Sequence, residues 1–275
     1  MYNRNRTKEN NQEVKDVEMY NEFARVYDTF MEDTPYEKWV AFIETILKKY
    51  EVTPNILCDL GCGTGTMCEL FAKKGIDVIG IDGSEEMLMV AREHAMEEEL
   101  EILYLLQDMS EFELYGTVDV IYSACDSLNY LLDEEKVRST FKWVNNYLEK
   151  GGLFIFDMNL PYKYKEVLGD KVFAEQTEDA AYIWENYYDE ATSVNEFAVT
   201  FFVEDEDGRY DRFEEVHYQK AYALEKIKQF LDEAGLELLA VHDDYTDKLA
   251  NHQTQRATFV AREKYIEGKF YSEKE

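Results

Sequence analysis

The sequence predicts an α/β protein with a doubly wound, mostly parallel sheet of seven strands and an inserted antiparallel β-subdomain. Two observations predict the parallel sheet: several short segments are apolar at almost every position, and they alternate with segments of helical periodicity. Such strands are typically buried on both faces by the helices between them. The third observation concerns residues 172–222, where aromatic residues alternate with polar ones and helix signals are scarce, which is typical of antiparallel strands.

The elements before the sheet follow from the spacing of apolar residues. Residues 1–15 are polar and are expected to form a flexible leader. Two helices are expected next, at residues 16–33 and 35–50, because aromatic and aliphatic residues recur there at helical spacing.

The alternation of strands and helices then begins. Five strands are expected at residues 55–60, 75–82, 101–109, 118–125 and 152–159. The intervening helices are expected at residues 65–74, 84–99 and 133–150. Ser84 and Asp133 favour N-cap positions, and Gly151 and Gly152 are expected to end the last of these helices.

The inserted subdomain and the end of the chain complete this scheme. Three antiparallel strands are expected at residues 181–190, 193–204 and 209–222, joined by short turns. A helix at 223–235 and strands at 236–246 and 255–263 are expected to rejoin the sheet, and 264–275 form a tail. The α/β domain is therefore expected to comprise residues 16–171 and 223–263, around an inserted subdomain of residues 172–222.

Composition limits the possible partners of the chain. Of its 275 residues, 45% are hydrophobic and 15% aromatic, which is enough for a packed core. The formal charge is −30, so the surface repels phosphate backbones and anionic lipids, and no basic patch offsets this. No apolar run reaches the length of a membrane span, and the first residues lack a signal sequence. We therefore expect a cytoplasmic protein that binds neither nucleic acid nor membranes.

The segment "DLGCGTG" at residues 59–65 follows the first strand and opens the next helix. Glycines at such a place let a ligand approach the backbone. The segment lacks the lysine of a phosphate-binding Walker loop, and Thr66 stands where a dinucleotide fingerprint needs its third glycine. A carboxylate at Asp59 would repel a pyrophosphate, so it favours a ligand that presents an amine or another cation.

Two further carboxylates follow the next strands. Asp82 ends the second strand, and its two oxygens can accept both hydroxyl groups of a ribose. Asp108 follows the third strand. A ligand with a ribose, a hydrogen-bonding base, positive charge and no phosphate fits these three residues, and S-adenosylmethionine has all four properties.

On these motifs the chain resembles a class I S-adenosylmethionine-dependent methyltransferase over residues 55–159. "DLGCGTG" matches the family motif D/E-x-G-x-G-x-G, "VIGIDGSEEML" matches the acidic second-strand motif, and "QDM" is similar to the third-strand motif. "YNEFARVYDTFMEDTPYEKW" and "CDSLNYL" more narrowly resemble a bacterial subgroup of small, mostly unassigned methyltransferases. The resemblance implies a Rossmann-like methyltransferase fold and S-adenosylmethionine as the cofactor, with S-adenosylhomocysteine as its product.

The resemblance also implies the cofactor contacts. Asp59 and the backbone of the glycine segment would hold the methionine part, Asp82 the ribose, and Met87 and Asp108 the adenine. The full set expected at the cofactor is Asp59, Gly61, Cys62, Gly63, Gly65, Asp82, Gly83, Met87, Asp108, Met109 and Tyr27. An aromatic ring over the sulfonium is worth ~0.5–2 kcal/mol. Of Tyr27, Tyr36 and Trp39, we expect one to serve in this way and the others to pack in the core.

The acceptor is expected to contact the loop after the fourth strand and the inserted strands. The residues assigned to it are Asp126, Asn129, Tyr130, Trp184 and Tyr188. The aromatic residues Trp184, Tyr187 and Tyr188 either cap the site or form a homo-oligomer interface, and the sequence leaves both open. Among the four histidines, His217 is the candidate for a catalytic base, and it fits an outward-facing position equally well.

Two other features of the sequence do not indicate a functional site. The four cysteines have neither the spacing of a zinc site nor that of a disulfide framework, and Cys125 is expected to be a buried thiol. "VEDEDGRYDRFE" resembles a calcium loop, but Val203 occupies the position of the first aspartate, so no metal site is expected.

The sequence therefore predicts methyl transfer from S-adenosylmethionine to a nitrogen or oxygen of a small molecule, by in-line displacement. The alternative is a protein that binds the cofactor without turnover and acts as a regulator or docking module. A nicotinamide-dependent oxidoreductase is a third possibility, and Asp59 disfavours it.

Overall fold

The computed structural model describes residues 31, 34–177, 180–204, 207–264, 267–269 and 271. The expected leader, Tyr27 and nearly all of the helix expected at residues 16–33 lie outside the described residues, as do residues 205–206 of the second expected turn and parts of the tail.

The larger sheet, sheet A, has seven strands in the spatial order β10-β11-β5-β4-β1-β2-β3. Their bounds are β1 Ile56–Leu60, β2 Asp77–Asp82, β3 Ile102–Leu106, β4 Val118–Ser123, β5 Leu148–Asn159, β10 Leu236–Asp243 and β11 Arg256–Glu263. Strands β1 to β5 pair in parallel, whereas β11 pairs antiparallel with both β5 and β10. This arrangement confirms the predicted doubly wound, mostly parallel sheet of seven strands.

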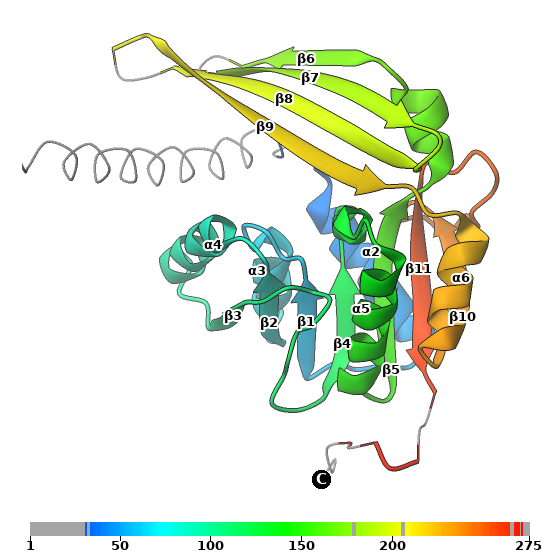
Figure 1. Ribbon diagram of the computed structural model, residues 1–275. Coiled ribbons are helices and arrows are strands. Elements are labelled where there is room, and N and C mark those ends of the chain that lie inside the picture. The colour runs from blue at the N-terminus through cyan, green and yellow to red at the C-terminus, as the bar shows by residue number, and fades with distance from the viewer. Residues whose placement is uncertain are drawn as a thin grey trace, which may run out of the picture.

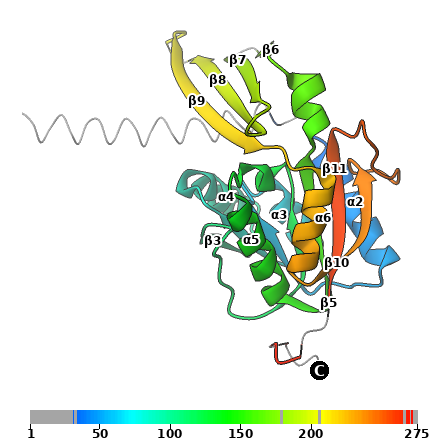
Figure 2. The ribbon, with the colours of Figure 1, turned by 45° about the vertical axis from the view of Figure 1, so that its right-hand side comes forward.

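Helices cover both faces of sheet A, as Figures 1 and 2 show. Their bounds are α2 Tyr36–Lys49, α3 Thr66–Ala72, α4 Glu85–Glu97, α5 Glu134–Tyr147 and α6 Leu224–Glu233. Apolar residues of α2, α3 and α4 form one core layer with the sheet, and those of α5 and α6 form the other. Burial on both faces explains why the strands of this sheet read as continuous apolar runs.

The second sheet, sheet B, is the predicted insertion. It is antiparallel, in the order β6-β7-β8-β9, and follows β5 in the chain. Its strands are β6 Val172–Gln176, β7 Ala180–Asp189, β8 Val194–Glu204 and β9 Tyr210–Lys220. Two short helical segments, η1 Ser127–Tyr130 after β4 and η2 Lys163–Leu168 after β5, contact β9 and β7 respectively. Sheet B therefore lies over the carboxyl ends of β4 and β5 (Figure 1).

The structure differs from the sequence predictions at several elements. Strand β6 was not predicted, because its mostly exposed residues show no apolar alternation. Helix α5 ends at Tyr147 rather than at residue 150, and Gly151 and Gly152 lie within β5 instead of ending the helix. A Cβ atom at Gly152 would lie 2.7 Å from the carbonyl oxygen of Asp119, so close approach to β4 explains this glycine. The short helical segments η1 and η2 were also not predicted.

Strand order reverses between β1 and β4. The chain runs from β1 through β2 to β3 on one side and continues with β4 on the other side of β1. In open α/β sheets, the crevice at the carboxyl ends of the two strands that flank such a reversal is the usual place for a ligand.

Candidate active site

The segment 59–65 forms a glycine loop at the end of β1, and its backbone is hydrogen-bonded to β2. The N–H groups of Gly61 and Cys62 both donate to the carbonyl oxygen of Ile81, at 2.8 and 3.0 Å. Gly65 is the N-cap of α3 with φ +85°, and a Cβ atom there would collide with the hydroxyl of Tyr104. By contrast, nothing lies within 4 Å of the Cβ position at Gly63, whose φ is +53°. The loop is therefore packed at Gly65 and open at Gly63, as a backbone that a ligand approaches must be.

Asp82 joins this loop to the end of β2. One carboxylate oxygen accepts from the N–H of Gly63 and the other from the N–H of Ser84, each at 2.8 Å. Burial raises the pKa of Asp82, while these backbone hydrogen bonds oppose the shift. Each carboxylate oxygen has a second lone pair, so the oriented group can still accept two hydroxyls. The exposed Gly83 follows it directly.

Asp59 lies beneath the glycine loop rather than on its surface. Its side chain is almost completely buried and accepts hydrogen bonds from the Tyr122 hydroxyl at 2.6 Å and the Cys68 thiol at 3.2 Å. Burial raises the pKa of Asp59 to about 7, against the lowering effect of these two donors. Burial also raises the pKa of Cys68. Asp59 therefore lies under the loop that the sequence predicts to bind the cofactor.

The remaining predicted cofactor residues lie around the same edge. Asp108 accepts from both the N–H and the hydroxyl of Ser110 and from the ammonium of Lys136 at 3.1 Å. Burial would raise the pKa of Asp108, but these donors lower it. The half-buried Met109 reaches within 3.3 Å of the Cβ position at Gly61, and Met87 lies in the first turn of α4.

The chain after β4 is held in an uncommon conformation. Cys125 and Asp126 both have positive φ, at +60° and +51°, although neither is glycine. The fully buried carboxylate of Asp157, on β5, accepts from both of their N–H groups, at 3.1 and 2.6 Å. It also accepts from the hydroxyl of Tyr245 at 2.7 Å. Strained backbone of this kind persists where its surroundings determine it, and it is frequent at functional sites.

The carboxylate of Asp126 connects four elements. It accepts from Arg256 of β11 at 2.5 Å and from the amide of Gln219 of β9 at 2.7 Å. The hydroxyl of Tyr164, in η2, donates to the same Gln219 at 2.8 Å. This acceptor-side network, Asp126–Gln219–Tyr164 with Arg256 and Asp157, lies where the sequence predicts the methyl acceptor.

Asn129 and Tyr130 of η1 have different environments. Asn129 is completely buried: its amide nitrogen donates to the carbonyl oxygens of Asn159 and Lys220, and its oxygen accepts from the N–H of Asn159. Its hydrogen-bonding groups thus join η1, β5 and β9. Tyr130 is 47% exposed, and its ring meets that of His217 edge-on at 5.9 Å.

His217 lies on the inner face of sheet B, the face that carries Gln219. Its Nε2 is 3.1 Å from the carboxylate of Glu215, two residues away on the same strand. The side chains are 29% and 18% exposed, so the pair is accessible but not fully solvated. A carboxylate in this position orients the imidazole.

The predicted aromatic residues of β7 divide between the two faces of sheet B. Trp184 and Tyr188 lie on the inner face, where Trp184 packs on Phe197 at 5.4 Å and Tyr188 stacks on Tyr164 at 6.1 Å. Tyr187 alternates to the outer face and is 62% exposed. The outer face also exposes Val216 and Tyr218, and a homo-oligomer formed through it stays a prediction.

The aromatic residues of α2 pack as a core group. Trp39 is buried and stacks on Tyr245 at 4.8 Å, and Tyr36 meets Trp39 edge-on at 5.4 Å. The guanidinium of Arg256 lies over Trp39 at 5.2 Å. α2 therefore contacts the acceptor-side network through Trp39 and Arg256.

Sequence reasoning missed Asp157, Gln219, Arg256 and Tyr245. Asp157 carried a usable signal, since it is an acidic residue near the end of an apolar strand, like Asp59 and Asp82. Arg256 had no such signal in the sequence, because its contact with Asp126 spans 130 positions and depends on the order of the strands.

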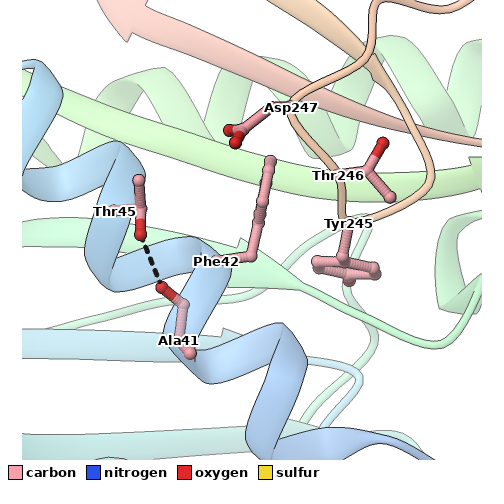
Figure 3. Close-up of a pocket in the computed structure, with 6 residues that line it drawn as sticks. All are labelled: Ala41, Phe42, Thr45, Tyr245, Thr246 and Asp247. Carbon is pink, nitrogen blue, oxygen red and sulfur yellow. Dashed lines mark hydrogen bonds between the residues drawn. The ribbon is translucent and has the colours of Figure 1, made fainter.

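Two hollows on the described surface lie away from the glycine loop. One of about 240 Å³ lies between α2 and the loop after β10, and Figure 3 shows its lining residues Ala41, Phe42, Thr45, Tyr245, Thr246 and Asp247. The other, of about 280 Å³, lies at the amino ends of the strands and includes Asp119, Gly152 and Arg262.

Among the described residues, no group of three or more acidic, histidine or cysteine side chains is arranged to hold a metal ion. No described helix has the length and apolar character needed to cross a membrane.

Comparisons with known proteins agree with this geometry. A family model described as "Methyltransferase domain" matches residues 57–152. A provisionally named methyltransferase of Geobacillus sp. strain WCH70 is 38% identical over 245 residues, covering 88% of this chain and 99% of the relative.

Two solved structures extend the comparison. The crystal structure of an S-adenosylmethionine-dependent methyltransferase from Clostridium acetobutylicum ATCC 824 is similar with a TM-score of 0.82 and 33% identity, covering 89% of this chain and 98% of that one. The S-adenosylmethionine-bound amino pentose methyltransferase CalS10 from Micromonospora echinaspora has a TM-score of 0.71 and 21% identity, covering 87% and 97%.

Proposed function

We propose a small-molecule acceptor with a nitrogen or oxygen nucleophile for this chain, which belongs to the class I S-adenosylmethionine-dependent methyltransferases. S-adenosylmethionine supplies an electrophilic methyl group on a positively charged sulfur. The protein then has to align the nucleophile with this methyl group and exclude water. Asp82, the open backbone at Gly63 and the carboxylate of Asp59 suit the ribose and the charged part of such a cofactor.

The observation that carries the proposal is the acceptor-side network under sheet B. It brings together polar groups of β9, of η2 and of the segment after β4, next to the glycine loop. The hydroxyl of Ser127 in η1 donates to the carbonyl oxygen of Gly61 at 3.3 Å, so the two halves of the site are in direct contact. Sheet B covers this edge, and a net charge of −30 disfavours nucleic acid. CalS10 acts on an amino pentose, which shows that a relative of this fold takes a small acceptor.

We assign the role of general base to His217. A hydroxyl acceptor has to lose its proton as it attacks, and a protonated amine has to lose one before it attacks; the Glu215–His217 pair is arranged to take it. Tyr130 packs against the imidazole and limits its orientations.

The cofactor half is tested by calorimetric titration with S-adenosylhomocysteine. The Asp82→Ala variant should bind at least roughly tenfold more weakly, because a hydrogen bond to a charged group is worth ~1.5–3 kcal/mol. Asp77→Ala, at the exposed beginning of β2, is the matched control and should bind like the wild-type protein.

The acceptor half is tested by measuring S-adenosylhomocysteine formation with a panel of amino sugars, small amines and hydroxy acids. With the best acceptor, His217→Asn should lower kcat by about 10²–10⁴ while S-adenosylhomocysteine affinity is unchanged. His252→Asn, at an exposed position, should keep full activity. If the protein binds S-adenosylhomocysteine tightly but methylates no member of the panel, the proposal fails and a binding regulator is favoured.

A further inference from the structure

We infer that the methyl acceptor carries a carboxylate group and that Lys163 binds it. This inference rests on the proposed function, since it assigns one further property to the small molecule bound at the acceptor-side network. Lys163 begins η2, directly after the carboxyl end of β5, and it is half-buried.

The ammonium of Lys163 has an unusual set of neighbours. It donates to the side-chain oxygen of Asn159 at 3.0 Å, and Asn159 is itself almost completely buried. The charges of Asp126, Arg256 and Asp157 act on it, but among the described residues no carboxylate lies within ion-pair distance of it. Burial lowers the pKa of Lys163, as expected for an ammonium withdrawn from water.

The nearby carboxylates are already engaged by other groups. Arg256 is 2.5 Å from Asp126 and 3.6 Å from Asp157, so one guanidinium bridges both. The second oxygen of Asp126 accepts from Gln219, and Asp157 accepts from two backbone N–H groups and Tyr245. Arg256 is thus the direct ion-pair partner of both carboxylates, and Lys163 lies beyond ion-pair distance of them.

An ammonium has three donors, and the described residues provide Lys163 with one neutral acceptor. Keeping a cation partly desolvated costs free energy when no anion is in direct hydrogen-bond contact with it, and such groups are frequent at functional sites. The neighbouring Lys165 shows the contrast: it is exposed and pairs with Glu190 at 2.8 Å. An anionic group of the acceptor would supply the missing partner of Lys163.

A carboxylate fits this place better than a phosphate. Phosphate groups are commonly held by bidentate arginines or by several backbone N–H groups. Here the arginine is already bridged to Asp126 and Asp157, and both carboxylates would repel a dianion more strongly than a monoanion.

The first test measures binding. Sodium acetate is titrated into the protein saturated with S-adenosylhomocysteine, at constant ionic strength, and followed by NMR of the backbone amides. Saturable shifts are expected at residues of η2 and the end of β5. Lys163→Met should weaken acetate binding at least tenfold, Lys163→Arg should keep most of it, and Lys165→Met, the matched control, should leave it unchanged.

The second test uses acceptors in pairs, each carboxylic acid beside its amide. The wild-type protein should methylate the acids at least tenfold faster, measured as kcat/KM, and Lys163→Met should lose this preference while its affinity for S-adenosylhomocysteine is retained. Equal rates with both members of each pair, or tighter binding of inorganic phosphate than of acetate through Lys163, would overturn the inference while leaving the proposed function in place. Turnover of no acceptor at all is the separate failure of the proposed function.

Discussion

The carboxyl group of Asp59 is buried under the glycine loop, between the hydroxyl of Tyr122 and the thiol of Cys68. Its pKa is raised from 3.8 to about 7, chiefly by burial. Between these two values the folded protein holds a proton that the unfolded chain has lost. The contribution of Asp59 to the free energy of unfolding therefore falls as pH rises from about 4 to about 7. A positively charged ligand above the loop favours the ionised form, so its binding should release this proton.

We expect S-adenosylmethionine affinity to rise with pH up to about 7 and then to level off, because Asp59 must ionise to stabilise the positive charge. Calorimetry at pH 6.5 in two buffers of different ionisation enthalpy should show release of a fraction of a proton on binding. Asp59→Asn should abolish most of this release and flatten the pH dependence. Asp77→Asn, exposed at the start of β2, should leave both as they are. Proton release that persists in Asp59→Asn would assign it to another group.

At the scale of the element, the segment between β4 and η1 depends on a residue of the neighbouring strand. Two successive non-glycine residues, Cys125 and Asp126, adopt positive φ there, at a cost of about 1–2 kcal/mol each. Asp157 offsets this cost by accepting both of their N–H groups. The strand that follows in the sheet thus determines the conformation of the acceptor loop.

Asp157→Asn should lower the free energy of unfolding by about 1–3 kcal/mol, because an amide cannot accept on both sides and leaves a buried N–H group without a partner. It should also lower kcat/KM for the acceptor while S-adenosylhomocysteine affinity stays near that of the wild-type protein. Asp119→Asn is the matched control. Its carboxylate accepts from the N–H groups of Asn55 and Ile56 at the opposite edge of sheet A. Acceptor kinetics should show impaired transfer only in Asp157→Asn. Denaturant unfolding should show a smaller loss of stability in Asp119→Asn, because both N–H donors there bond to one oxygen, which an amide can supply.

The elements that the sequence predicted well are those whose signals are local. Ser84 and Asp133 cap their helices as expected, and β1 to β4 lie within the predicted ranges. Strand β5 begins at Leu148, four residues before its predicted start. Strand β6 was not predicted, because an exposed edge strand needs no apolar alternation. The acceptor side was only partly predictable, because Asp126 meets Arg256 and Gln219 through strand order and through the docking of sheet B. The roles assigned to the cofactor and acceptor residues stay predictions.

At the scale of the whole molecule, sheet B contacts the α/β domain mainly through η1 and η2. Buried Asn129 supplies three hydrogen bonds to this junction, two to Asn159 and one to Lys220. Gln219 supplies two more, to Asp126 and Tyr164. Since buried polar links of this kind are costly to break, they keep the acceptor side and the cofactor side in one arrangement.

Asn129→Ala should loosen this junction without disturbing the cofactor half. Loss of its buried partners should cost about 2–4 kcal/mol and should accelerate amide hydrogen exchange in η1 and β9, with β1 and β2 unaffected. Asn145→Ala, which removes a buried link from α5 to the carbonyl oxygen of Ala234, is the comparison variant. Its exchange should rise near α5 and α6 instead. Equal exchange in β9 of the Asn129 variant and the wild-type protein would contradict the assigned role.

The two contacts of the Asn129 amide nitrogen also bear on how the segment with sheet B joins the α/β domain. Asn159 precedes the segment that contains sheet B and Lys220 ends it, yet their carbonyl oxygens accept from the same side-chain nitrogen. The segment therefore leaves and re-enters the α/β domain at a single point. An insertion with adjoining ends adds little constraint to its host, as domain insertions illustrate. Changes within sheet B are therefore expected to leave β1, β2 and the glycine loop undisturbed.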